Sequence, residues 1–256
     1  MTWWQALILG IVQGASEFLP ISSSGHLLLL EKLGVGQENL FFNIMVHVGT
    51  LVAVLIAMRK SWLPLLRRPF QKTTGYILLA CVPTVALALI FKFFAPSLIS
   101  GRLLGFGFVL TACLLIASEI FKKSQTTLLS AKTSILTGVL QGIAVLPGVS
   151  RSGATISALT LQGVEKSEAA NFSFLLSIPI IIGSALLEGI DLARGSLTLD
   201  VGTLPLIIGT ASAFISGLLS INLFMKLIKK HSMIGFAIYT VLLGIVVTLL
   251  PIWGIL

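Results

Sequence analysis

The sequence predicts an all-α polytopic membrane protein, with about six transmembrane helices and two re-entrant helical hairpins arranged as an inverted-topology repeat. Composition is the first observation behind this prediction. The chain is 56% hydrophobic and 10% charged, with a mean hydropathy of +1.05, whereas ordinary soluble domains are about 25% charged. The second observation is a polar, glycine-rich segment that occurs twice, half the chain apart. Polar groups are costly in so apolar a chain, so the doubled segment indicates a functional site.

Six apolar segments approach the roughly 20 residues that cross a bilayer as helix. They lie at about 40–58, 75–94, 103–121, 170–190, 204–225 and 234–253. Of the 17 Lys and Arg, 12 fall in the loops on one side of this scheme and four in the loops on the other. Because cytoplasmic loops carry the excess of Lys and Arg, we expect the basic loops inside the cell and both termini outside. This placement also accounts for the net charge of +8 without nucleic acid as a partner.

The two polar segments align at an offset of 128 residues. The first reads GIVQGASEFLPISSSGH from Gly10, and the second reads GVLQGIAVLPGVSRSGA from Gly138. The two copies have the same residue at six positions, which in the first copy are Gly10, Gln13, Gly14, Ser22, Ser24 and Gly25. The informative mismatches are Glu17 against Val145, Ser23 against Arg151, and His26 against Ala154. One copy therefore carries an acid and an imidazole, and the other carries a guanidinium.

Neither polar segment has the pattern of a spanning helix. The first is interrupted by Pro20 and a run of serines, and the second by Pro147 and Gly148. The helical pieces expected after these breaks are short, at 26–33 and at about 153–163. A re-entrant hairpin, which turns near the midplane and leaves on the side it entered, accommodates these breaks. Each half, about 1–123 and 124–256, is then one hairpin plus three spans within a single membrane domain of residues 1–256. An odd number of spans inverts the second half relative to the first.

The two hairpin turns are expected to meet and to bind an anion. Each turn leads into a helix whose first N–H groups have no intrahelical partner. Arg151 adds a planar, charged fork that suits two oxygens of a phosphate. For each serine, simple helix capping is the alternative interpretation. The candidate phosphate-binding residues are Ser22, Ser24, Gly25, Ser150, Ser152, Gly153 and Thr155.

The first copy carries the groups suited to acid–base chemistry. Glu17 lies one helical turn after Gln13 on the same face. Its carboxylate can act as a general base, bind a hard divalent cation with Gln13, or simply pair with Arg151. His26, beside the serine run, could be a nucleophile, a general acid or a general base. His47 lies inside the first span without a matching motif, so we expect a structural role for it.

These segments resemble a known family. QGASEFLPISSSGHL and LPGVSRSGATIS are similar to the two signature segments of the bacitracin-resistance type of undecaprenyl pyrophosphate phosphatase, and NFSFLLSIP at 171–179 is similar to a further segment. The resemblance covers nearly the whole chain. It implies a multi-pass hydrolase of the bacterial plasma (inner) membrane that removes one phosphate from undecaprenyl pyrophosphate. The monophosphate carrier lipid then returns to peptidoglycan and cell-wall synthesis, and the cell resists bacitracin.

The resemblance also implies roles for particular residues. Its acidic motif, with Glu or Gln first and Glu four residues later, falls on Gln13 and Glu17. Its serine, histidine and arginine fall on Ser23, His26 and Arg151, which with Glu17 are the expected catalytic residues. It implies a divalent cation, Mg²⁺ or Ca²⁺, with Glu17 and Gln13 as candidate ligands. Whether a serine, a histidine or water attacks the phosphorus stays open at this point.

One rival function follows from the same architecture. Inverted repeats with broken helices are common in transporters, so the protein could instead carry or flip a phosphorylated lipid. In either case the expected partners are a polyprenyl pyrophosphate lipid and the membrane lipids, and a homodimer is one option for its assembly.

Overall fold

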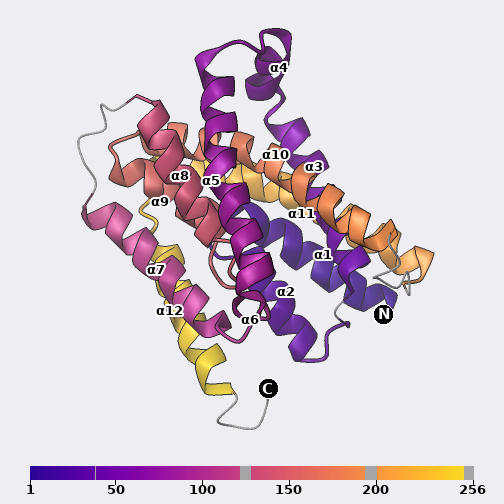
Figure 1. Cartoon of the computed structure of the whole chain (residues 1–256). Helices are drawn as coiled ribbons and strands as arrows, with labels where there is room; N and C mark the ends of the chain where they lie inside the picture. The colour runs from indigo at the N-terminus through magenta and orange to yellow at the C-terminus, as the bar shows by residue number, and fades with distance from the viewer. Residues whose placement is uncertain (38, 122–127, 194–200, 251–256) are drawn as a thin grey trace.

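The structure is a computed structural model that describes residues 1–37, 39–121, 128–193 and 201–250. Every regular element in these residues is a helix (Figure 1), which confirms the all-α class. The helices are α1 (Trp3–Phe18), α2 (Ser23–Lys32), α3 (Leu40–Ala57), α4 (Arg59–Arg67), α5 (Lys72–Phe94), α6 (Pro96–Ile99), α7 (Leu104–Ile120), α8 (Ala131–Ile143), α9 (Arg151–Leu161), α10 (Lys166–Ala193), α11 (Thr203–Lys230) and α12 (Ile234–Leu249).

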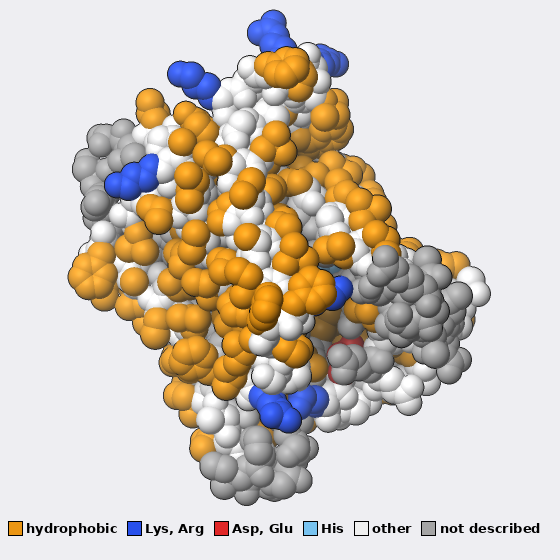
Figure 2. Space-filling model, in the orientation of Figure 1, with side chains coloured by type: hydrophobic (Ala, Val, Ile, Leu, Met, Phe, Trp, Pro, Cys, Tyr) orange, Lys and Arg blue, Asp and Glu red, His pale blue; other side chains and the backbone are white. Residues whose placement is uncertain are grey.

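All six predicted apolar segments form helices. Among the described residues, α3, α5, α10 and α11 are long and apolar enough to cross a membrane. The remaining two, α7 with 17 residues and α12 with 16, are shorter apolar helices. Figure 2 shows hydrophobic side chains across most of the visible face, with Lys and Arg gathered mainly toward its upper and lower ends. Such a surface suits a multi-pass membrane protein.

The basic loop after the first span contains a helix that the hydropathy pattern did not predict. This helix, α4, carries Arg59 at its start and Arg67 at its end, and none of its residues is fully buried. Its apolar residues, such as Trp62 and Leu65, pack against the core at helical spacing and not as one continuous run, so a search for apolar runs misses it. In Figure 1, α4 lies at the top, beside the ends of α3 and α5.

The two polar segments form the helix pairs α1–α2 and α8–α9. Helix α1 ends at Phe18 because Leu19, which precedes Pro20, takes an extended conformation. Helix α2 begins at Ser23 and α9 at Arg151, two to three residues earlier than we expected. Ser23 and Arg151 therefore occupy the same place, the first residue of the second helix in each pair. The entry of these pairs from opposite faces of a membrane stays a prediction.

Helix contacts follow the sequence repeat. The offset of 128 residues relates α1 to α8, α3 to α10, α5 to α11 and α7 to α12. Helix α1 packs along α11, and α8 packs in the same way along α5. Likewise α3 contacts α11, α10 contacts α5, and the related helices α7 and α12 pack on each other. Each half thus supplies the helix against which the hairpin of the other half packs.

Glycines allow α1 to approach α11 closely. A Cβ atom on Gly14 would lie 2.0 Å from Ser216 Oγ and 2.3 Å from the carbonyl oxygen of Ala213. One on Gly10 would meet the Ser212 hydroxyl at 2.0 Å. Small residues at such contacts are typical of helices that pack in membranes. Helix α1 of the first hairpin is therefore anchored closely to α11 of the second half.

Candidate active site

The two hairpin turns meet. A Cβ atom on Gly25 would come within 3.0 Å of Gly148 Cα, and one on Gly153 would come within 3.3 Å of Pro20 Cβ. The Ser152 hydroxyl also donates to the carbonyl oxygen of Leu19 at 3.0 Å, which ties one turn to the other. Because Gly25 and Gly153 are equivalent in the repeat, the contacts are reciprocal. Their missing side chains let the two backbones approach each other.

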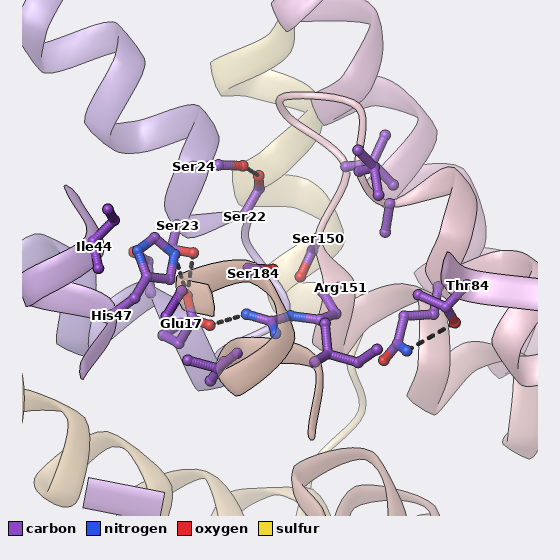
Figure 3. Close-up of a pocket in the computed structure, with 18 residues that line it drawn as sticks. Glu17, Ser22, Ser23, Ser24, Ile44, His47, Thr84, Ser150, Arg151 and Ser184 are labelled. Carbon is purple, nitrogen blue, oxygen red and sulfur yellow. Dashed lines mark hydrogen bonds and ion pairs between the residues drawn. The ribbon is translucent and has the colours of Figure 1, made fainter. Parts of the chain in front are cut away.

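A cavity of about 280 Å³ opens beside this contact, and both hairpins contribute to its wall. Figure 3 shows Glu17 and Arg151 pointing toward one another across it, with Ser23 and His47 next to Glu17. The polar and charged lining residues are Ser16, Glu17, Ser22, Ser23, Ser24, His47, Thr84, Gln141, Ser150, Arg151 and Ser184. The structure thus gathers the acid of one repeat and the guanidinium of the other in one cavity.

Glu17 is the centre of the polar network. Its side chain is 1% exposed, and Arg151 Nη2 donates to its Oε1. The Ser23 hydroxyl donates to Oε2 at 2.5 Å, and Gln13 Nε2 donates to the same oxygen at 3.0 Å. A carboxylate this deeply buried is tolerated only with such compensation. Ser23 and Arg151, which are equivalent in the repeat, therefore bind the two oxygens of one carboxylate.

The candidate phosphate-binding residues divide into two groups. Ser22, Ser24 and Ser150 line the cavity. Ser22 Oγ accepts from Gly25 N at 3.3 Å, and Ser150 Oγ accepts from Gly153 N at 3.1 Å. Ser22 and Ser150 therefore also cap α2 and α9. The remaining predicted residues, Ser152, Gly153, Gly25 and Thr155, do not line it. They hold the turns together instead, and the Thr155 hydroxyl lies 2.6 Å from that of Ser173 in α10.

His26, which we expected beside Glu17 and Arg151, is not among the residues that line the cavity. Its Nδ1 is 2.6 Å from the carbonyl oxygen of Ser22, and its Nε2 is 2.7 Å from the hydroxyl of Tyr239. The ring stacks on that of Tyr239, with centroids 5.7 Å apart and an angle of 6° between the planes. Both ring nitrogens are therefore engaged, and the structure does not bring His26 to Glu17 and Arg151.

His47, for which we expected a structural role, lines the cavity beside Glu17, where the sequence had suggested His26. Its Nε2 is 4.0 Å from Glu17 Oε2, and its side chain is 31% exposed. Its Nδ1 is 2.7 Å from the carbonyl oxygen of Asn43, which fixes the ring. A sequence signal did exist, since Asn43, His47 and Thr50 form a polar stripe at helical spacing on an apolar span.

The same cavity can be tested for a divalent cation. Within the described residues there is no cluster of three or more His, Cys, Asp or Glu that could hold a metal. Glu17 is the one carboxylate in the lining, accompanied by serine hydroxyls, and the buried Gln13 Oε1 has no hydrogen-bond partner in the described part of the chain. Mg²⁺ commonly binds through one or two carboxylates and takes its other ligands from water and substrate phosphates. The donor set fits a cation shared with phosphate and not a closed metal site.

The fold and this cavity define a class: a polytopic helical membrane protein with a polar cavity between two broken helix pairs. Comparison with known proteins identifies the family. The family model described as "Bacitracin resistance protein BacA" matches residues 6–246, so the chain belongs to this family.

Several relatives extend over the whole chain. It is 39% identical to the "Undecaprenyl-diphosphatase" of Carboxydothermus hydrogenoformans, over 99% of each chain. It is 40% identical to the "Undecaprenyl-diphosphatase" of Bacteroides fragilis, over 96% of this chain and 97% of the relative. It is also 36% identical to the "Undecaprenyl-diphosphatase 3" of Bacillus cereus, over 98% of both.

Proposed function

We propose that this protein is an undecaprenyl-diphosphatase, which hydrolyses undecaprenyl pyrophosphate to undecaprenyl phosphate and inorganic phosphate. Family membership and the names of full-length relatives support this function. The observation that carries it is the cluster of Glu17, Ser23 and Arg151 in a cavity between the two turns. The reaction returns the carrier lipid to peptidoglycan and cell-wall synthesis, and this recycling confers resistance to bacitracin.

Arg151 and the serines bind the pyrophosphate. The guanidinium has five N–H donors in a planar fork, so it can keep its contact with Glu17 and also donate to phosphate oxygens. Ser22, Ser24 and Ser150 add hydroxyls along the same wall. The first residues of α2 and α9 contribute N–H groups from their helix ends. These donors stabilise the charge on the phosphoryl oxygens as the transition state forms.

Ser23 is the nucleophile in this mechanism. Its hydroxyl already donates to Glu17 Oε2 at 2.5 Å, which is the arrangement of a nucleophile and its base. Glu17 takes the proton as Ser23 Oγ bonds to the terminal phosphorus. The bond from that phosphorus to the bridging oxygen breaks, and the lipid phosphate leaves with the electron pair. Water then attacks the phosphoserine, inorganic phosphate leaves, and the proton returns to Ser23 Oγ.

A divalent cation, Mg²⁺ or Ca²⁺, belongs to the proposal. Glu17 and the Oε1 of Gln13, which is unpaired among the described residues, would hold it together with the phosphates. When bound, it neutralises negative charge on the phosphoryl oxygens. Gln13 supports this arrangement by donating to Glu17, which orients the carboxylate.

The proposed setting is the bacterial plasma membrane. The bias of basic residues supports a cytoplasmic position for the loops around α4 and at the end of α11, with the termini on the outer face. The two hairpins then enter from opposite faces, and the chain is a single domain of two inverted halves. The isoprenoid tail stays in the lipid while the pyrophosphate reaches the cavity.

The decisive assay is release of inorganic phosphate from undecaprenyl pyrophosphate by the purified protein. Ser23→Ala should abolish release, and wild-type protein trapped with β-labelled substrate, in which the terminal phosphate carries the label, should carry label on Ser23. Ser100→Ala serves as the matched control, because the Ser100 hydroxyl bonds only locally, to the carbonyl oxygen of Ser97 at 2.8 Å. Wild-type protein that moves the lipid between leaflets without releasing phosphate would overturn the proposal in favour of a flippase.

A further inference from the structure

The turn that presents Ser23 has an unusual backbone. Ser22 has a φ of 71°, and among the described residues it is the one non-glycine residue with a positive φ. Such a conformation is rarely adopted by a residue with a side chain, and it persists where the surroundings hold it. The equivalent residue of the second repeat, Ser150, has an ordinary φ of −74°. The first turn therefore needs a restraint that the second turn does not need.

His26 supplies that restraint. Its Nδ1 contacts the Ser22 carbonyl oxygen at 2.6 Å. A carbonyl oxygen only accepts, so Nδ1 carries the hydrogen and Nε2 of the neutral ring accepts from the Tyr239 hydroxyl at 2.7 Å. This carbonyl belongs to the peptide unit that continues into Ser23, so its orientation sets the position of the Ser23 side chain. In the second repeat, where the serine is unstrained, Ala154 replaces the histidine.

The repeat relates Tyr239 to a residue that supports the other turn. Thr111 of α7 stands 128 residues before Tyr239 of α12. Its hydroxyl donates to the carbonyl oxygen of Gly148 at 2.9 Å and accepts from the backbone N–H of Ser150 at 2.8 Å. Thr111 thus holds the second turn directly. Tyr239 holds the first turn through His26, and each support comes from the opposite half of the chain.

We propose that Tyr239 and His26 are positioning residues for Ser23: together they clamp the strained Ser22 peptide so that the Ser23 hydroxyl stays against Glu17. This inference rests on the proposed function for its catalytic consequence. It assigns a role in the reaction to Tyr239, which lies in α12 outside both signature segments. It also explains why His26 stands next to the serine run without reaching the cavity.

Tyr239→Phe tests the clamp with the smallest change, because it removes the hydroxyl and keeps the stacked ring. We expect kcat for phosphate release from undecaprenyl pyrophosphate to fall about 3- to 10-fold, as for the loss of one hydrogen bond. KM should stay within about twofold, because the phosphate-binding groups are unchanged. Tyr76→Phe, at the only other tyrosine of the chain, is the matched control and should behave as wild type. Equal kcat values for the two variants would overturn the proposal.

Substitutions of His26 separate positioning from direct chemistry. Asparagine can place an N–H donor near the position of Nδ1, whereas glutamine and alanine cannot. We expect His26→Asn to retain turnover within about tenfold of wild type and His26→Gln and His26→Ala to lose about 100-fold, the scale of a small misplacement of a reacting group. If His26 were the nucleophile or transferred a proton, all three variants would be inactive. Inactivity of all three variants would therefore refute the clamp. If His26→Asn does not fold, Tyr239→Phe decides the question.

Thermal unfolding tests the clamp without substrate. The melting temperatures of Tyr239→Phe, His26→Ala and the double variant form a cycle in one detergent. The fall in melting temperature of the double variant should be smaller than the sum of the two single falls, because each substitution breaks the same chain of hydrogen bonds. Additive losses would contradict the clamp, whatever the activity. If the wild-type protein releases no phosphate, the proposed function fails, while this cycle still decides on the clamp.

Discussion

Arg151 offers a test of how much of the site is structural. Its guanidinium pairs with Glu17, whose side chain is 1% exposed, while that of Arg151 is 23% exposed. Arg151→Gln removes the cation and leaves a carboxylate buried with only Ser23 and Gln13 as hydrogen-bond donors. Breaking a buried pair by removing one partner costs about 3–5 kcal/mol. Because Arg151 keeps some contact with solvent, we expect Arg151→Gln to lower the free energy of unfolding by about 3 kcal/mol, at the lower end of that range.

The assay is thermal unfolding in a single detergent. A loss of about 3 kcal/mol corresponds to a fall of about 6–12 °C in Tm, at about 2–4 °C per kcal/mol for a chain of this size. Glu17→Gln should cost a similar amount, because it leaves the arginine uncompensated. The double variant Glu17→Gln with Arg151→Gln should recover at least half of either loss, since no buried charge remains. Arg68→Gln, at an exposed arginine, is the control and should stay within about 0.5 kcal/mol of wild type.

Activity separates the two roles of the pair. Both single variants and the double variant should lack phosphate release, even where the double variant regains stability. Arg151→Lys should keep most of the stability but lose most of the turnover, because an ammonium cannot replace the planar fork. The reasoning fails if Arg151→Gln lowers Tm by less than about 2 °C, or if the double variant is no more stable than the single ones. Near wild-type turnover by Arg151→Lys would refute the role of the fork.

Three further predictions concern packing, a second ion pair and the cation. Gly14→Ala should lower the free energy of unfolding by about 1–3 kcal/mol, because the added methyl group collides with α11. Gly183→Ala should raise it by about 0.5–1 kcal/mol, because no atom lies within 4 Å of a Cβ at this position. Melting curves that do not separate the two variants would contradict the close packing. Lys166→Met should lower Tm more than Lys132→Met, at an exposed lysine of α8, because Glu119 is 6% exposed and accepts from Lys166 Nζ at 2.5 Å. A chelator should stop phosphate release yet leave Tm unchanged, because Arg151 already compensates Glu17; a large fall in Tm would instead indicate a structural metal.

Much of the fold could be predicted because each span is determined by its own composition. An apolar run of about 20 residues in lipid must satisfy its backbone internally, so it forms a helix. Helix α4 was missed because its stability does not come from an apolar run. The starts of α2 and α9 were placed two to three residues late, since serine and glycine are weak helix formers and the caps at Ser22 and Ser150 become visible only in three dimensions.

The site was harder to predict, because tertiary contacts decide which polar groups meet. Glu17, Ser23 and Arg151 were predictable, because the repeat placed them in equivalent turns. His26 lies in the same polar segment as Ser23, but its ring contacts Tyr239. This partner is 213 residues away in the sequence, and no local pattern predicts the contact. His47 reaches the cavity only because α3 packs beside α1. The polar stripe of Asn43, His47 and Thr50 on α3 indicated a buried polar contact, but without a motif it did not indicate which one.

The mismatches between the repeats explain how a duplicated structure can build an asymmetric site. Ser23 and Arg151 are the first residues of α2 and α9, and both contact Glu17, whose counterpart is Val145. Val145 lines the same cavity. A glutamate there would add a second carboxylate, and two like charges in a buried site disfavour each other's ionised form. A second arginine in place of Ser23 would likewise remove the proposed nucleophile and leave an excess cation. Charge compensation in the cavity therefore requires one carboxylate against one guanidinium, and this requirement leaves the other equivalent position free for the Ser23 hydroxyl that we propose as the nucleophile.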